Sequence, residues 1–124
     1  MVDSPLILVV DDSPIQRKIY TATLKNAGYS VLIAENGREG VAVALDSHPA
    51  LILMDVSMPE MDGPTAVREL RRYAEMDGVP VVAVTAVAEQ EELEQLFQAG
   101  FDDVIDKNSD RAALVERVRR WMAD

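Results

Sequence analysis

The chain has no cysteine, and His48 is its single histidine among 124 residues. Without cysteine it can form no disulfide scaffold, no thiolate metal site and no cysteine nucleophile, and its composition suits a reducing compartment. One histidine is too few for a multi-histidine metal centre and makes a serine–histidine–aspartate triad hard to build. We interpret His48, which lies in the loop before the third expected strand, as a surface residue.

Positive charge is also scarce. The chain has 12 lysines and arginines against 22 aspartates and glutamates, a formal net charge of −10 and an isoelectric point near 4.4. Phosphate backbones and anionic lipids repel such a chain, so we expect no nucleic-acid or membrane partner; cations and basic protein surfaces suit it better. No apolar run approaches the roughly 18 residues of a membrane-spanning helix, and Asp3 stands where a signal peptide carries bases. We therefore expect a soluble, cytoplasmic protein.

What the chain does have is an alternation of two patterns. Its length and its composition, 48% apolar and 27% charged, predict one globular domain over residues 1–124. Short apolar runs occupy residues 6–10, 31–34, 51–54, 79–84 and 103–105. Because most of these runs are unbroken, they predict strands covered on both faces of a parallel sheet.

Segments with helical periodicity separate these runs. The first begins with Ser13-Pro14 and Gln16, a capping box with proline at the first helical position, and Gly28 is placed to end it. Its expected inner face comprises Ile15, Ile19, Ala22 and Thr23.

The later helices are expected to begin at Asn36, at Asp62, near residue 88 and after Ser109, and Gly100 should end the fourth. The second helix is expected to run through Val41 and Leu45. The third and fourth are expected to turn Val67, Leu70, Leu93, Leu96 and Phe97 inward, and the last has helical spacing at Leu114, Val118, Trp121 and Met122. Five strands alternating with five helices predict an α/β fold, with a parallel sheet wound on both faces by right-handed crossovers.

Polar residues stand where four of these strands end. Asp11-Asp12, Asp55, Thr85 and Lys107 follow the first, third, fourth and fifth apolar runs. Ligands of such folds bind beyond the carboxyl ends of the strands. Three crowded carboxylates need a cation, and an all-oxygen site suits Mg²⁺. A carboxylate beside Mg²⁺ and a lysine can attack a phosphoryl group and carry it as an acyl phosphate. Any one of these residues alone is more often a helix cap or a loop residue, so the prediction depends on their convergence.

These residues resemble a known family. Asp11-Asp12, the stretch 53–63 (Leu-Met-Asp-Val-Ser-Met-Pro-Glu-Met-Asp-Gly), Thr85-Ala86 and Lys107 are similar to the CheY-like receiver domain of two-component response regulators. The resemblance covers essentially the whole chain. It implies a flavodoxin-like (βα)5 fold, with a five-stranded parallel sheet in the order 2-1-3-4-5.

The resemblance also implies roles for individual residues. Asp55 would be the phospho-acceptor. Mg²⁺ would be bound by Asp12 and Asp55 directly, by Asp11 through a water, and by the backbone carbonyl of Ser57. Thr85 and Lys107 would contact the phosphoryl group, and these two residues with Asp55 would form the catalytic set.

For the whole domain, the resemblance implies a signalling switch and not an enzyme, beyond assistance to its own phosphorylation and dephosphorylation. A histidine kinase or phosphotransfer protein would be the phosphodonor. A downstream protein would bind the face made by the fourth helix, the fifth strand and the fifth helix. Residues 1–124 would be the receiver domain alone, with no output domain in this chain.

Three positions depart from the family's pattern. Val104 replaces an aromatic switch residue, Asn108 replaces the proline after the lysine, and Ala50 stands where aspartate is frequent. With Val104 we expect phosphorylation-linked change to centre on Thr85 and residues 86–88. We expect a trans bond between Lys107 and Asn108, because a cis bond before asparagine costs roughly 3–4 kcal/mol.

Two other functions remain as alternatives. One is an Mg²⁺-dependent phosphatase of the haloacid dehalogenase type, which needs a second acid two residues after its nucleophile. Ser57 occupies that position after Asp55 and disfavours this alternative. The other is a pseudo-receiver that binds partners without phosphate. Loss of an acid or of the lysine would indicate it, and all of them are present.

Overall fold

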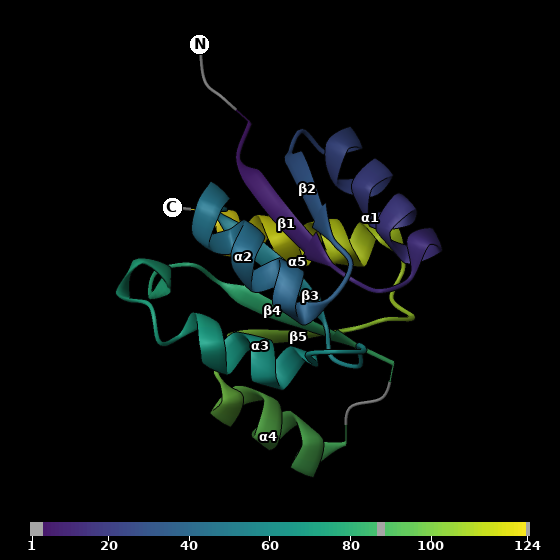
Figure 1. Cartoon of the computed structure of the whole chain (residues 1–124). Coiled ribbons are helices and arrows are strands. Elements are labelled where there is room, and N and C mark those ends of the chain that lie inside the picture. The colour runs from purple at the N-terminus through teal and green to yellow at the C-terminus, as the bar shows by residue number, and fades with distance from the viewer. Residues whose placement is uncertain (1–3, 87–88, 124) are drawn as a thin grey trace.

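The protein folds around one five-stranded parallel sheet, in the order β2-β1-β3-β4-β5. The structure is a computed structural model that describes residues 4–86 and 89–123 (Figure 1). Its strands are β1 (Leu6–Val10), β2 (Ser30–Ala34), β3 (Leu51–Asp55), β4 (Val81–Thr85) and β5 (Asp103–Asp106). The predicted fold class and strand order are confirmed. β3, β4 and β5 each run one residue past the predicted end, so the site residues Asp55 and Thr85 are the last residues of β3 and β4.

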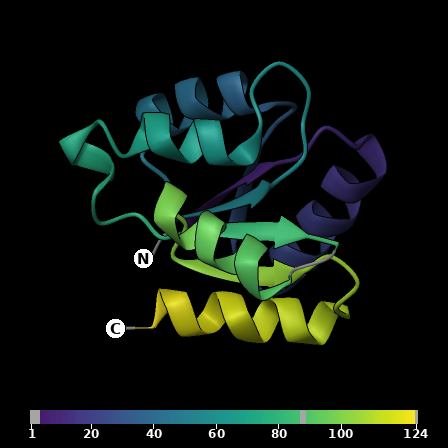
Figure 2. The ribbon, with the colours of Figure 1, turned by 90° about the horizontal axis from the view of Figure 1, so that it is seen from below.

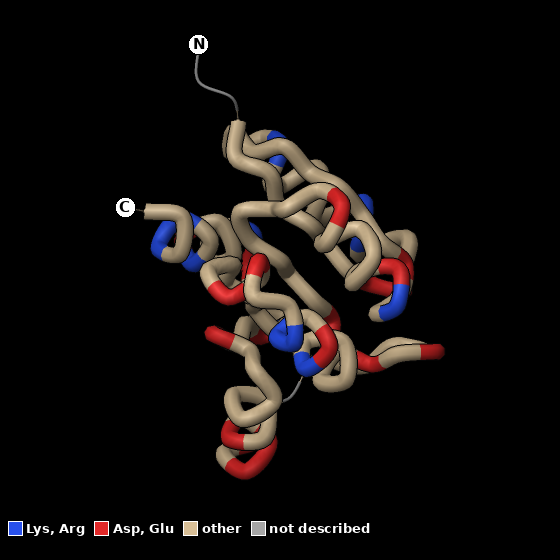
Figure 3. The backbone as a smooth tube through the Cα atoms, turned by 60° about the vertical axis from the view of Figure 1, so that its left-hand side comes forward, with Lys and Arg blue, Asp and Glu red and all other residues tan. Residues whose placement is uncertain are grey.

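Helices cover both faces of the sheet, as Figures 1 and 2 show. α1 (Pro14–Asn26) and α5 (Arg111–Met122) pack on one face; α2 (Gly37–Ser47), α3 (Gly63–Leu70) and α4 (Gln90–Ala99) pack on the other. Successive strand side chains alternate between the two apolar layers, so Ile7 and Val9 face α1 and α5 whereas Leu8 and Val10 face α2 and α3. Charge is uneven over the surface: acidic residues lie on α4 and basic residues near the end of α5 (Figure 3).

The starts of the first three helices agree with the sequence, and the start of α5 does not. The predicted caps Ser13, Asn36 and Asp62 each accept a hydrogen bond from the backbone N–H three residues ahead, at 3.3, 2.8 and 2.9 Å. In α5 the cap is Asp110, which accepts from the N–H three residues ahead at 2.8 Å, and the prediction of Ser109 is wrong by one residue. Asp and Ser are equally good caps, so propensity alone could not choose between them.

Two inner faces were predicted correctly only in part, because Thr23 and Leu96 are buried as expected but other members are exposed. Ile15 is 71% exposed and Ala22 is exposed, while α1 buries Tyr20, Thr23 and Leu24. Likewise Phe97 is 48% exposed, and α4 buries Leu96 and Ala99. Apolar periodicity allowed neighbouring stripes on each helix, and the position of the helix axis over the sheet selected one that only partly overlaps the predicted stripe.

β2 departs from the expected double coverage. It is one of the two edge strands of the sheet, and its Leu32 and Ile33 are 40% and 47% exposed. An unbroken apolar run therefore predicted the strand correctly and its burial wrongly.

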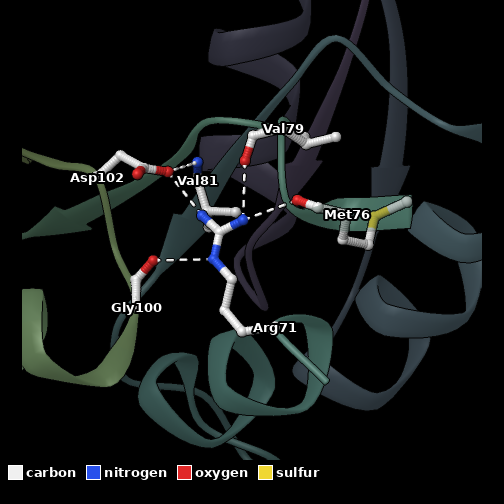
Figure 4. A network of polar contacts seen from close by, with 6 residues as sticks. All are labelled: Arg71, Met76, Val79, Val81, Gly100 and Asp102. Atoms are coloured by element: carbon white, nitrogen blue, oxygen red, sulfur yellow. Dashed lines mark hydrogen bonds and ion pairs between the residues drawn. The ribbon is translucent and has the colours of Figure 1, made fainter. Parts of the chain in front are cut away.

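Arg71 joins the end of α3 to the segments around the start of β4 (Figure 4). Its guanidinium donates to three backbone carbonyls and one carboxylate, those of Met76 (2.8 Å), Val79 (3.1 Å), Gly100 (3.2 Å) and Asp102 (2.6 Å). The Asp102 carboxylate also accepts from the N–H of Val81 at 2.8 Å. Residues 79 and 80, predicted as strand, belong to this connection, which includes the short helix η1 (Ala74–Met76).

Two further expectations concern the backbone. The peptide bond between Lys107 and Asn108 is trans, as is every other bond among the described residues. The predicted start of the fourth helix near residue 88 lies outside the described residues; the described helix begins at Gln90. Within residues 4–86 and 89–123, no helix is both long and apolar enough to cross a bilayer.

Candidate functional site

Three carboxylates meet at the carboxyl ends of β1 and β3. These strands are neighbours in the sheet, and the pairing of Val10 with Met54 brings the residues that follow side by side. One carboxylate oxygen from each of Asp11, Asp12 and Asp55 lies within 4.8 Å of the other two. Asp11 and Asp55 are only 1% and 5% exposed, whereas Asp12 is open to solvent. The structure thus brings the three predicted acids together.

Asp11 is held in place by its own turn. Its Oδ1 accepts from the N–H of Ser13 at 2.9 Å, and its backbone N–H donates to the carbonyl of Ala34 at 3.1 Å. Its Oδ2 is buried and has no hydrogen-bond partner among the described residues. Burial raises the pKa of Asp11, and the nearby charge of Asp55 raises it further, which outweighs the lowering by the Ser13 N–H. A buried anionic oxygen without a donor favours a bound cation.

Asp55 lies between the cluster and a lysine. Its Oδ2 is 3.3 Å from Nζ of Lys107, and its Oδ1 accepts from the N–H of Ser57 at 3.4 Å. Burial raises the pKa of Asp55 despite the opposing effect of the Lys107 ammonium. Among the described ion pairs, Asp55 is thus the member of the cluster whose carboxylate also contacts a cation of the protein.

Thr85 and Lys107 complete the rim from β4 and β5. Thr85 is buried, and its carbonyl accepts from the backbone N–H of Lys107 at 2.8 Å. Ser57 lies exposed in the loop after β3. All six predicted site residues therefore lie at the end of the sheet formed by the carboxyl ends of the strands. The expected centre of conformational change falls partly outside the described residues, because these exclude residues 87 and 88.

Close backbone contacts hold the loop between β3 and α3 against the site. A Cβ on Gly63 would lie 2.7 Å from the carbonyl oxygen of Asp55, and one on Gly37 would overlap the carbonyl of Met61. Both glycines also donate from their N–H groups, Gly63 to Val56 at 2.9 Å and Gly37 to Met61 at 3.2 Å. The sequence showed Gly63 at a helix start and in the stretch that resembles the receiver family, but its close packing against Asp55 depends on contacts made by folding.

Tyr20 is a neighbour that the sequence did not reveal. It is buried in α1, and burial together with the charges of Asp11 and Asp55 raises its pKa to about 12. It therefore remains a neutral phenol near the acids at physiological pH. Nothing in its position along the chain marks it as close to them.

A second feature lies on the face made by α4, β5 and α5. A hollow of about 330 Å³ adjoins Thr85 and is lined by Leu93, Val104, Ile105, Asp106, Ser109, Ala113 and Arg117. Beside it, Asp103 accepts from Arg117 at 2.8 Å and from the indole N–H of Trp121 at 2.7 Å. Burial opposes ionisation of Asp103, but these hydrogen bonds outweigh it and hold its pKa below the usual value.

The chain resembles known proteins over nearly its whole length. The profile of the response regulator receiver domain matches residues 7–119. The chain is 37% identical to protein PilH of Pseudomonas aeruginosa over 117 residues, which cover 94% of this chain and 97% of that protein. It is 29% identical to the polar-differentiation response regulator DivK of Brucella ovis over 118 residues, or 95% and 96% of the two chains.

Solved structures agree. The receiver domain of a sensor histidine kinase from Pseudomonas aeruginosa, which has a magnesium ion coordinated in its active site cleft, is 35% identical. It superposes with a TM-score of 0.90 over 98% of this chain and 99% of that one. The chemotaxis response regulator CheY4 of Vibrio cholerae is 29% identical, with a TM-score of 0.91 over 95% and 98%.

Proposed function

The chain belongs to the family of response regulator receiver domains of two-component signalling, and on that premise we propose that Asp55 carries the signal as an aspartyl phosphate. Receiver domains are signalling switches that receive phosphoryl groups from histidine kinases and act on downstream partners. The alternative of a haloacid-dehalogenase-type phosphatase is therefore wrong.

The observation that carries the proposal is the position of the Asp55 carboxylate. It is buried, it lies 3.3 Å from Nζ of Lys107 and it faces two further acids. In the proposed step an oxygen of Asp55 attacks the phosphorus of a phosphohistidine. A new P–O bond forms, the P–N bond breaks, and the imidazole leaves with the electron pair and takes up a proton.

Lys107 and Thr85 are proposed to hold the transferred group. Once Asp55 carries the phosphoryl group as an acyl phosphate, its carboxyl group no longer bears the negative charge, so the Lys107 ammonium can pair with a phosphoryl oxygen. Thr85 ends the neighbouring strand, and its hydroxyl is suited to donate to a second oxygen. The hydrogen bond from the backbone N–H of Lys107 to the carbonyl of Thr85 fixes the position of one residue relative to the other.

The donor set fits Mg²⁺. Receiver domains bind this ion at their acidic site, and the orphaned Oδ2 of Asp11 together with three carboxylates within 4.8 Å is consistent with it. We assign Asp12, Asp55 and the carbonyl of Ser57 as direct ligands and Asp11 as a ligand through water. The ion would supply positive charge against the carboxylates and the incoming phosphoryl group.

The output surface is proposed to be the face of α4, β5 and α5. The hollow beside Thr85 connects the site to this face, so movement of Thr85 would change the hollow's shape. Val104 is β-branched and stiff, and it has no ring to swing between two positions. The change would therefore pass through Thr85 and the loop that follows it.

Intact-mass measurement after incubation with acetyl phosphate and Mg²⁺ tests the proposal. We expect a gain of one phosphate in the native protein and none in Asp55→Asn. The control is Asp62→Asn in the same loop, which removes the same charge, keeps a good helix cap and should still be phosphorylated. A native protein that gains no phosphate would support the pseudo-receiver alternative, and a phosphorylated Asp55→Asn would show that another residue is the acceptor.

A further inference from the structure

The two edges of the sheet differ in how they discourage association. β5 forms one edge, and it carries Asp103 and Asp106 within its four residues. β2 forms the other edge and reads Ser-Val-Leu-Ile-Ala, without charge or proline. Proteins commonly blunt an exposed edge strand with charges, prolines or bulges, because its unpaired backbone groups can pair with another strand. β2 lacks the charge and the proline, and its Leu32 and Ile33 are 40% and 47% exposed.

The backbone N–H and carbonyl groups of alternate residues in β2 point away from β1. The N–H of Ser30 donates to Pro5 at 2.9 Å, and the carbonyl of Ala34 accepts from Asp11 at 3.1 Å, so both residues point toward β1. Backbone direction alternates along a strand, so the N–H and carbonyl groups of Val31 and Ile33 point away from β1. Among the described strands, β1 is the sole neighbour of β2.

We propose that a second copy of this chain pairs with β2 in antiparallel orientation, related by a two-fold axis that passes between the two Leu32 residues. In this register Val31 faces Ile33 of the second copy, and Ile33 faces Val31 of the second copy. The outward backbone groups of these residues have no partner strand in the described sheet, so each pair can exchange both of its hydrogen bonds. Leu32 then faces Leu32 of the second copy at a position without hydrogen bonds, where side chains approach most closely.

Self-complementarity is the reason to choose a second copy as the occupant. One register satisfies the outward backbone groups of Val31 and Ile33 and sets the apolar side chains of residues 31–33 opposite one another, with Ser30 opposite Ala34 at each end. The two-fold operation also closes the assembly, so it forms a dimer and no open filament. A groove of about 420 Å³ beside Ile33, lined by Pro14, Arg17, Lys18, Thr21 and Ala22, leaves room for side chains of the second copy.

The net charge opposes this association. Each copy carries a formal net charge of −10, so two copies repel each other at low ionic strength. Added salt screens the repulsion and leaves the apolar and hydrogen-bonded contacts in place. Dimerisation should therefore strengthen as salt rises, whereas an interface built on opposite charges would weaken.

Sedimentation equilibrium of the full chain tests the surface. We expect a monomer–dimer equilibrium in the native protein and a dissociation constant raised about tenfold or more in Ile33→Lys. The matched control is Phe97→Lys on α4, which adds the same charge at a side chain of nearly equal exposure, 48% against 47%, and should dimerise like the native protein. A monomeric native protein would overturn the proposal, and so would a dimer that Phe97→Lys disrupts and Ile33→Lys does not.

Cross-linking tests the register, and the absence of native cysteine makes the readout clean. In Leu32→Cys the two introduced thiols lie opposite each other, and a mild oxidant should yield a disulfide-linked dimer rapidly. In Ile33→Cys each thiol faces Val31 of the second copy, so cross-linking should be much slower. Equal rates for the two variants, or faster linkage of Ile33→Cys, would refute this register.

Discussion

Replacement of Asp12 by asparagine separates two effects of the acidic cluster. One is the repulsion among its carboxylates, which lowers the stability of the fold, and the other is its role in phosphorylation. Asp12 is the exposed member of the cluster, and the structure gives it no hydrogen bond that asparagine would lose among the described side-chain contacts. The substitution keeps the shape of the side chain and removes one negative charge. We expect Asp12→Asn to be more stable than the native protein without Mg²⁺ and to lose phosphorylation.

The magnitude follows from the distance between the carboxylates. The carboxylate oxygens lie within 4.8 Å of one another, and at that upper limit two unit charges repel by about 0.9 kcal/mol in a water-like medium and by about 3.5 kcal/mol at an effective dielectric constant of 20. Solvent screens Asp12, so the lower figure applies to each of its two pairs. Removal of the charge should therefore raise the free energy of unfolding by about 1–2 kcal/mol.

Urea unfolding at pH 7, with chelator and with Mg²⁺, is the assay. Mg²⁺ at ten times its dissociation constant should stabilise the native protein by about 1.4 kcal/mol, and it should stabilise Asp12→Asn much less. The control is Asp77→Asn at an exposed acid outside the cluster, which should stay within about 0.5 kcal/mol of the native protein. Destabilisation of Asp12→Asn in chelator, or equal stabilisation of both proteins by Mg²⁺, would refute the reasoning.

The cluster also predicts how stability depends on pH. The pKa values of Asp11 and Asp55 are raised by burial, so without Mg²⁺ the native state binds protons at a higher pH than the unfolded chain does. The free energy of unfolding should therefore rise as pH falls from 7 through these raised values. With Mg²⁺ bound, the free energy of unfolding should rise less as pH falls, because the ion already reduces the repulsion between the carboxylates that protonation would relieve.

Three other predictions concern stability. Arg71→Met should cost about 2–4 kcal/mol in urea unfolding, because it leaves backbone carbonyls without their donor, while Arg72→Met, at a 75% exposed side chain, should cost less than about 0.5 kcal/mol. Because the pKa of Asp103 is lowered in the folded state, its contribution to stability is present above about pH 4 and is lost as pH falls through its folded-state pKa. The fluorescence of the single tryptophan, which donates to Asp103, should follow that titration and should cease to do so in Asp103→Asn. Gly63→Ala should lower the melting temperature markedly, since its Cβ would lie 2.7 Å from a carbonyl oxygen of β3; an unchanged melting temperature would contradict this.

The site was predictable because the topology brings separated residues together. Once the strands are parallel and neighbouring, residues that follow them must share one edge, so Asp11, Asp55, Thr85 and Lys107 could be placed together from the sequence. The electrostatic state of the site was only partly predictable. Crowding of acids is visible in the sequence, but the orphaned oxygen of Asp11 and the position of Tyr20 depend on burial by other elements.

What the sequence could not supply is the identity of the neighbour that covers each apolar side chain. Ile15 and Phe97 fit a helical period and are nonetheless exposed, because the helix axes turn an adjacent stripe toward the sheet. Leu32 and Ile33 sit in a run as apolar as the central strands, but their strand has a neighbour on one side only. The hydrophobicity of a segment indicates that its burial is favourable, but it does not identify the element that buries it. On β2 the fold leaves that cover outside the chain, and a second β2 can provide it in a single register.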